Sequence, residues 1–182
     1  MEVHVIGEVI GGKRFGRGSL MCRWTMVYGD GWSVLEGVTE GQTQVDDPWI
    51  AAGDSADSFD AVWEHPIDVH FRSSSLAGWP MIRFHVWHHD SNGRNEPLGH
   101  GAVRVPTCPG IYDDIGCSTW RPKGGVIDEA TTFFLGGAPR VVDERTVTST
   151  DDRRGFKTVS SGTVLLRLSI LLKDAERHGL SF

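Results

Sequence analysis

Residues 78–106 read GWPMIRFHVWHHDSNGRNEPLGHGAVRVP, and this stretch decides the fold class. Its first part alternates between two sets of side chains, Ile82, Phe84 and Val86 in one and Arg83, His85 and Trp87 in the other. Alternation with a period of two residues indicates a β-strand that buries one face. A loop rich in turn-forming residues follows, and residues 99–105 return to an extended pattern. The stretch therefore predicts two strands joined by a long polar loop, as in a β-sandwich.

Other strand-like segments recur between turn signals. The expected strands are residues 3–10, 20–28, 32–36, 67–72, 81–87, 99–105, 140–148, 155–159 and 164–172. Many short strands with little helix favour an all-β sandwich or barrel. One short helix is expected in a crossover at residues 128–135, where Asp128 can cap the first turn and Gly136-Gly137 can end it. The acidic residues 46–60 predict a mobile surface loop.

Composition limits the broad class of the protein. The chain has 182 residues, of which 39% are hydrophobic, and this suits one sizeable core better than two. A formal net charge of −6 argues against nonspecific nucleic-acid binding. No apolar run reaches the roughly 17 to 25 residues of a membrane-spanning helix, and no signal-peptide pattern opens the chain, so we expect a soluble intracellular protein. The three cysteines are irregularly spaced, which predicts reduced thiols.

The polar loop at residues 88–99 resembles the calcium-binding loop of C2 domains. That loop carries Val-x-Asp-x-Asp, another Asp six residues later, and then an apolar residue and Gly. The matching positions here are His88, Asp90, Glu96, Leu98 and Gly99. A calcium site needs about six to eight oxygen ligands, and two carboxylates beside an imidazole supply too few. Asp90 and Glu96 are therefore only weak metal candidates, and we expect no metal and no cofactor.

A narrower resemblance rests on the order of several short motifs. These are GQTQV (41–45), WEHPIDVHF (63–71), GWP (78–80), DSNGR (90–94), TWRP (119–122) and GTV (162–164). Each motif alone is weak evidence, but in this order they resemble the B9-domain family of the ciliary transition zone. The resemblance covers residues 3–179. The sequence departs from the family at Glu96 and in the acidic segment 51–60, which is longer than the family needs.

The resemblance implies a fold, a role and a place. The fold would be a C2-like antiparallel β-sandwich over residues 1–174, followed by a short tail at 175–182. The role would be that of a structural subunit of the Meckel-syndrome, or tectonic-like, complex. Its partners would be other B9-domain proteins, namely B9 domain-containing protein 1 and Meckel syndrome type 1 protein. The place would be the cytoplasmic transition zone and basal body, where the complex supports cilium assembly and gates protein entry.

The sequence gives little support to catalysis. It contains no Gly-x-Ser-x-Gly, no Gly-x-x-x-x-Gly-Lys and no His-Glu-x-x-His motif, so we expect no catalytic residue and no enzyme activity. The histidines near the polar loop raise the question of zinc. On one strand, His85 and His89 would share a face about 13 Å apart, which is too far for one ion. Solvated loop histidines are the simpler interpretation.

Residues 164–172 suggest where a partner protein could bind. Val164, Leu166, Leu168, Ile170 and Leu172 form one continuous apolar face, which predicts a central or partner-packed strand. The opposite face is mixed and carries Leu165, Arg167 and Leu171. Trp87, on the opposite side of its strand from Phe84, is a further candidate because Trp is frequent at binding hot spots. A second covered core face remains an equal alternative for Trp87.

A rival interpretation concerns residues 11–18, GGKRFGRG, which are basic and carry one aromatic residue. Lys13, Arg14, Phe15 and Arg17 could contact anionic lipid headgroups, as loops of some C2 domains do. Charges near a membrane contribute about 1 kcal/mol each, which gives only weak attraction. A hairpin connection is favoured for this stretch. The alternative function is a peripheral phospholipid-binding C2-type module near a membrane surface, with weak or no calcium dependence.

Overall fold

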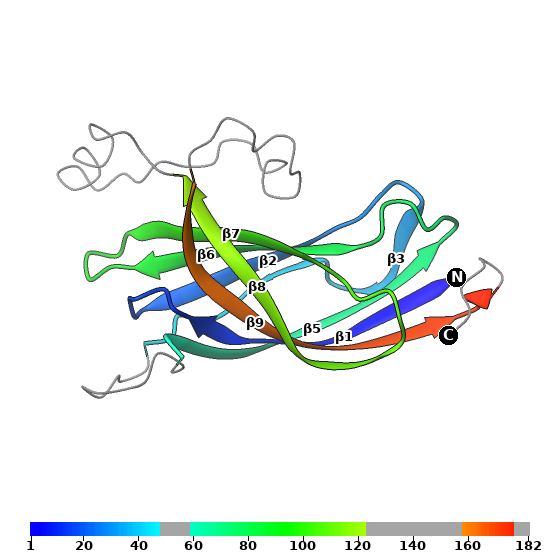
Figure 1. Cartoon of the computed structure of the whole chain (residues 1–182), viewed down its shortest axis with the longest axis horizontal. Coiled ribbons are helices and arrows are strands. Elements are labelled where there is room, and N and C mark those ends of the chain that lie inside the picture. The colour runs from blue at the N-terminus through cyan, green and yellow to red at the C-terminus, as the bar shows by residue number, and fades with distance from the viewer. Residues whose placement is uncertain (48–58, 123–157, 177–182) are drawn as a thin grey trace.

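The computed structural model describes residues 1–47, 59–122 and 158–176. Within these ranges the chain forms one antiparallel sheet of nine strands (Figure 1). The strands are β1 (Glu2–Lys13), β2 (Leu20–Val27), β3 (Trp32–Gly37), β4 (Glu40–Gln42), β5 (Ala61–Ser73), β6 (Met81–His89), β7 (Asn95–Arg104), β8 (Gly110–Pro122) and β9 (Thr158–Lys173). Their order across the sheet is β3-β5-β1-β9-β8-β7-β6-β2-β4. The predicted all-β antiparallel class is confirmed.

The sheet forms two layers because its halves are joined weakly. The single registered pair between β7 and β8 in the described residues is His100 with Trp120, whereas β8 pairs with β9 along most of its length. Figure 1 shows β8 and β9 running obliquely to β6 and β7. The half β3-β5-β1-β9-β8 and the half β7-β6-β2-β4 therefore curl around one core, to which both contribute buried side chains.

Strand β9 supplies the middle of that core. It lies between β1 and β8, as its apolar face predicts. Val164, Leu166, Leu168 and Ile170 all have 0% exposure. Burying one such side chain contributes about 1.5–3 kcal/mol relative to leaving it exposed. The other layer meets them with the buried alternate residues of β2 and β6, which are Cys22, Trp24, Met26, Ile82, Phe84 and Val86.

Several element boundaries differ from the prediction. β4 and β8 were not expected, and β5 begins at Ala61 instead of residue 67. Residues 158 and 159, at the end of the segment predicted at 155–159, belong to the same strand as residues 164–172, whereas residues 155–157 lie outside the described residues. The expected helix at 128–135, the expected strand at 140–148 and most of the acidic loop at 46–60 lie outside the described residues.

β8 was not predicted from the sequence because its pairing with β9 is irregular. Its pairing with β9 jumps between Tyr112 and Ile115, so Asp113 and Asp114 fall outside the ladder and interrupt the alternation in the sequence. Beyond the irregularity, Cys117 and Thr119 are buried at alternate positions. This short alternation was the feature of the sequence from which β8 could have been predicted.

Backbone proximity at the β1–β9 pair gives a test of the fold. A Cβ atom on Gly7 would overlap the carbonyl oxygen of Arg167 and approach Leu168 Cα to 2.9 Å. Because backbone atoms cannot move aside as a flexible side chain does, Gly7→Ala should lower the free energy of unfolding by about 2 kcal/mol. Urea denaturation followed by tryptophan fluorescence measures this change.

The matched control is Gly116→Ala on β8. A Cβ there would meet Thr163 Cγ2 at 3.5 Å, which is an ordinary van der Waals contact. This substitution should change stability by less than about 1 kcal/mol. Equal destabilisation by both variants would contradict the inferred closeness of β1 and β9.

Candidate functional site

The outward sides of β9 and its neighbour β8 carry the two most exposed large apolar side chains of the strands in this layer, Leu171 and Ile111. In the register of the sheet, Ser169 of β9 lies opposite Ile6 of β1 and Ile111 of β8, and Leu171 follows two positions later on the same face. Ile111 is 73% exposed, Leu171 is 54% exposed and Ile6 is 36% exposed. We call this area the β9 face and define it as Ile6, Ile111, Leu165, Arg167 and Leu171.

Charged groups lie on the β9 face and beside it. Arg167 forms ion pairs with Glu8 of β1 at 2.9 Å and with Asp113 of β8 at 3.2 Å. Because Arg167 bridges both neighbouring strands, its side chain lies across β9. All of these groups are exposed or partly exposed, so each pair contributes little to stability. Along the face they separate Leu165 from Ile6, Ile111 and Leu171.

A second group of charges lies near the start of β1. Glu2 accepts hydrogen bonds from Lys173 at 3.2 Å and from Arg72 at 3.3 Å. The hydrogen bond from Lys173 has the largest influence and lowers the pKa of Glu2, Arg72 lowers it further, and burial opposes them. The rings of His4 and His70 stack beside this group with centroids 4.9 Å apart.

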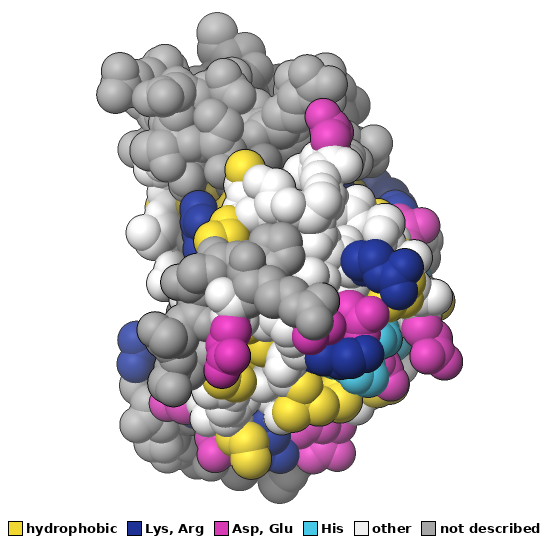
Figure 2. Space-filling model, turned by 90° about the vertical axis from the view of Figure 1, so that its right-hand side faces the viewer, with side chains coloured by type: hydrophobic (Ala, Val, Ile, Leu, Met, Phe, Trp, Pro, Cys, Tyr) yellow, Lys and Arg dark blue, Asp and Glu magenta, His cyan; other side chains and the backbone are white. Residues whose placement is uncertain are grey.

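Figure 2 shows the molecule from the end at which Met1 lies. Hydrophobic side chains are interspersed there with acidic, basic and histidine side chains, and they form no single broad apolar area. Interfaces that form and dissociate are commonly about as polar as the rest of a protein surface.

The structure brings some predicted partner residues together and separates another. Leu165, Arg167 and Leu171 all lie on the β9 face, where Leu165 is half-buried. Trp87 lies on β6, and both β8 and β7 separate β6 from β9 in the sheet. Trp87 is half-buried and pairs across the strands with Met21 and Pro97. It therefore belongs to a different surface.

The two metal candidates are each engaged by an arginine. Asp90 Oδ1 accepts the backbone N–H groups of Asn92 and Arg94, both at 2.8 Å, and Asp90 Oδ2 accepts Arg94 Nε at 3.1 Å. The backbone hydrogen bond from Arg94 is the main cause of a lowered pKa of Asp90. Glu96 is paired with Arg17 at 2.7 Å. In the described part of the chain, no three His, Cys, Asp or Glu residues gather as metal ligands would.

The basic residues of the rival interpretation lie where β1 ends and the next loop begins. Lys13 Nζ lies 4.5 Å from the centroid of the Phe59 ring, and Phe15 packs against the core. The backbone N–H groups of Phe15 and Gly16 both donate to Asp60. Arg14 is exposed, and Arg17 reaches Glu96 on β7. The loop is thus fastened to the sandwich, and its aromatic residue points to the protein interior.

Sequence reasoning missed a buried histidine, His100 on β7. Its ring meets that of His85 edge to face with centroids 4.7 Å apart, and His100 is 5% exposed. Burial, followed by the charges of His85 and Arg83, lowers the pKa of His100 to about 4. The Nδ1 atom of His100 is buried without a hydrogen-bond partner. The only indication of this histidine in the sequence was that His100 falls within the strand predicted at residues 99–105.

The other histidines of this region have local partners. His88 Nδ1 lies 2.8 Å from the carbonyl oxygen of Gly18, and His89 Nδ1 lies 2.8 Å from Asn95 Oδ1. Both rings therefore make contacts within the loop end of the sandwich, at positions where the sequence suggested solvated side chains.

The lowered pKa of His100 predicts a pH dependence of stability. In the unfolded chain the imidazole takes up a proton near pH 6.5, whereas in the folded protein it does so only at about pH 4. Between about pH 6.5 and about pH 4, a falling pH therefore favours the unfolded state. The free energy of unfolding should therefore fall by on the order of 3 kcal/mol across this window. His100→Gln should remove that part of the slope in urea denaturation at a series of pH values.

His89→Gln serves as the matched control, because His89 lies in an exposed contact at the loop. It should retain the slope of the unsubstituted protein. A His100→Gln variant with an unchanged slope would show that other groups cause the pH dependence.

None of the helices in the described ranges combines the length and the apolar character needed to span a membrane.

Comparison with known proteins gives the family of the chain. A family model described as "Ciliary basal body-associated, B9 protein" matches residues 3–171. This chain belongs to the B9 protein family.

Individual B9 proteins are similar to this chain over most of its length. B9 domain-containing protein 2 of Homo sapiens is 43% identical over 179 residues, covering 98% of both chains. The protein of the same name from Danio rerio is 41% identical with the same coverage. B9 domain-containing protein 1 of Mus musculus is 32% identical over 161 residues, covering 88% of this chain and 76% of the mouse protein. The resemblance seen in the motifs is confirmed.

Proposed function

We propose that this B9 protein is a non-enzymatic structural subunit of the Meckel-syndrome, or tectonic-like, complex at the ciliary transition zone. In this role it binds B9 domain-containing protein 1 and Meckel syndrome type 1 protein, and supports cilium assembly and the gating of protein entry. Similarity to ciliary basal body-associated B9 proteins along nearly the whole chain supports the proposal. The proposed domain spans residues 1–174.

The exposure of two apolar side chains supports the choice of the β9 face as the binding surface. Ile111 and Leu171 are 73% and 54% exposed although they belong to strands at the centre of the sheet. Covering such side chains contributes about 25 cal/mol for each Å² removed from water. A partner that covers the β9 face gains this energy, and Arg167 within the face offers a charged hydrogen-bonding group. We therefore assign partner binding to Leu165, Arg167 and Leu171 together with Ile6 and Ile111.

Phospholipid binding is the alternative function, and the contacts of its loop support it less well. Phe15 packs against the core, and Arg17 is paired with Glu96. Inserting Phe15 into a membrane would require it to leave the core. Liposome flotation of the isolated protein, with calcium or with a chelator, separates the two functions. Recovery with anionic liposomes that depends on Lys13 and Arg14 would favour the alternative.

Charge placed on the β9 face should disrupt assembly. Leu171→Arg puts a further guanidinium into the proposed interface, where desolvating it is unfavourable. Affinity for a mixture of B9 domain-containing protein 1 and Meckel syndrome type 1 protein should fall at least about tenfold, which corresponds to about 1.4 kcal/mol. Arg167→Glu should also weaken binding. Co-elution in size-exclusion chromatography and isothermal titration calorimetry measure both effects.

Val38→Arg is the matched control, because Val38 is 62% exposed and lies between β3 and β4, away from β9. It should leave binding unchanged. The β9 face is excluded as the interface if Leu171→Arg and Arg167→Glu both bind as tightly as the unsubstituted chain. The assembly role itself is excluded if the unsubstituted chain fails to co-elute with the mixture.

A further inference from the structure

The boundary between β7 and β8 leaves one side of β8 largely unpaired. β8 pairs with β9 along its other side, whereas toward β7 only Trp120 has a registered partner in the described residues. The two strands stay close as far as Ser118, since a Cβ atom on Gly101 of β7 would lie 3.1 Å from the carbonyl oxygen of Ser118. Figure 1 shows β7 and β8 diverging away from this point. We call residues 110–116 the β8 edge.

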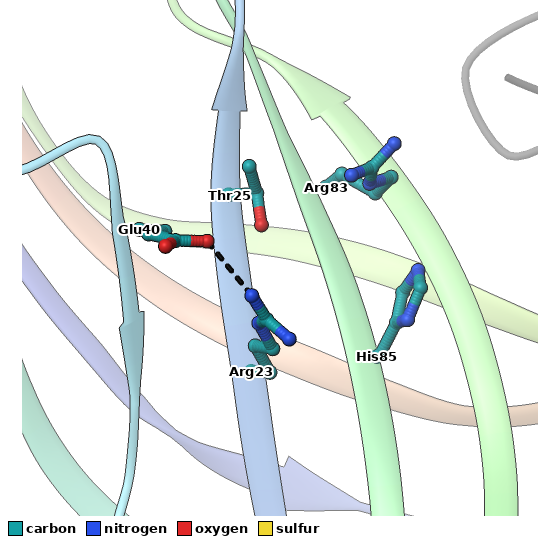
Figure 3. Close-up of a pocket in the computed structure, with 5 residues that line it drawn as sticks. All are labelled: Arg23, Thr25, Glu40, Arg83 and His85. Atoms are coloured by element: carbon teal, nitrogen blue, oxygen red, sulfur yellow. Dashed lines mark hydrogen bonds and ion pairs between the residues drawn. The ribbon is translucent and has the colours of Figure 1, made fainter. Parts of the chain in front are cut away.

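The strands at the two ends of the sheet order are shorter than β8. β3 has six residues and β4 has three, whereas β8 has 13. Short edge strands are one means by which proteins avoid pairing with another chain. On β4, Glu40 lies 2.8 Å from Arg23 Nη2, so the carboxylate at this edge already has a cation. These two residues line a pocket of about 160 Å³ together with Thr25, Arg83 and His85 (Figure 3).

The β8 edge differs from β4 in carrying a carboxylate without a cation. At the register irregularity of β8, Asp113 and Asp114 together lie opposite the single residue Arg167 of β9. Arg167 forms an ion pair with Asp113 at 3.2 Å. Asp114 is exposed and has no ion-pair partner within the ranges that the structure describes. Charge of this kind on an edge discourages pairing with strands that cannot neutralise it.

Apolar contacts hold the β8 edge in place. Tyr112 and Ile115 pack against the core, and the Tyr112 hydroxyl donates to the carbonyl oxygen of Cys108 at 3.1 Å. Ile111, in contrast, is 73% exposed. Because the backbone is already extended, adding a strand to it requires little further ordering of the chain. An added strand would hydrogen-bond to the open side of the backbone and cover Ile111.

Charge decides between a second copy of this chain and a different partner. Two copies of the β8 edge paired about a twofold axis would bring Asp113 and Asp114 of one copy close to the same residues of the other. Like charges opposite one another on neighbouring strands are destabilising, and the formal net charge of −6 adds to the repulsion between copies. A segment with a lysine or arginine near Asp114 gains an opposite-charge pair instead.

We propose that the β8 edge binds an extended segment of a partner protein by strand addition, and that this segment carries a basic residue beside Asp114 and an apolar residue against Ile111. Backbone hydrogen bonds supply the affinity, and the two side-chain contacts supply the selectivity. The inference specifies how the proposed assembly subunit engages a partner, and it rests on that role. A strand bound in this way lies beside β8 in the sheet, whereas a partner on the β9 face lies over the sheet.

The test is a titration of the full-length, 15N-labelled chain monitored by NMR. The probe is a capped heptapeptide of alternating valine and threonine with a central lysine, and the same peptide with a central glutamate is its control. The amide signals of residues 110–116 should shift saturably with the lysine peptide, and their hydrogen exchange should slow. The lysine peptide should bind about fivefold more tightly than the glutamate peptide, because an opposite-charge pair across strands replaces a like-charge pair.

Asp114→Lys should reverse this preference, so that the glutamate peptide binds more tightly. Asp30→Lys is the matched control, because Asp30 is an exposed aspartate in the loop before β3, and β3 lies at the opposite edge of the layer from β8. It should retain the preference for the lysine peptide. Dispersed amide signals in each variant establish that it is folded.

The strand-addition proposal is overturned by any of three results: no shift of the signals of residues 110–116 with either peptide, equal affinity for both peptides, or a reversed preference in Asp30→Lys. These results are separate from the co-elution that tests the assembly role. A failed peptide titration with intact co-elution removes strand addition alone, whereas failed co-elution removes the role on which it rests.

Discussion

The sandwich depends on the burial of one side of β9 between β1 and β8. Four consecutive alternate residues of this strand are removed from water, at Val164, Leu166, Leu168 and Ile170. The same register that directs them inward directs Leu165, Arg167 and Leu171 outward, because a strand alternates between its faces. The core and the β9 face are therefore set by one choice of register. A shift of β9 by one residue relative to its neighbours would turn the core residues outward and the residues of the β9 face inward.

The two layers present different chemistry to the outside. The layer containing β9 exposes apolar side chains on both sides of the ion pairs of Arg167. The layer containing β2 and β6 has a small hollow lined by Arg23 and Arg83 among others. Because β7 and β8 share one registered pair in the described residues, the layers diverge and their outward sides serve as separate surfaces. Two separate surfaces are what the proposed assembly role requires.

Patterns along single strands allowed much of the fold to be predicted. The apolar alternation of β6 and β9 identified their buried faces, because side-chain direction in a strand depends only on position. The order of short motifs identified the family. β8 was missed because Asp113 and Asp114 sit at a register irregularity that only the partner strand reveals. The helix expected at residues 128–135 lies outside the described residues.

The candidate sites were harder to predict because they form across strands. Arg167 was identified from its own strand, yet its partners Glu8 and Asp113 are far from it in the sequence. The pocket beside Thr25 depends on the pairing of β2 with β4 and β6, which no local pattern specifies. Similarly, Trp87 was assigned to an interface by its strand face, but the sheet order places it away from β9.

The position of β9 along the chain affects biosynthesis. β9 follows all of its sheet neighbours in sequence, and β1, with which it pairs, is the first strand. During translation, the apolar side chains of β1 and β8 that lie next to β9 remain uncovered until β9 has emerged from the ribosome. Such nascent chains are prone to aggregation and are typical clients of chaperones. The sandwich of this B9 protein is therefore completed only after β9 has been synthesised.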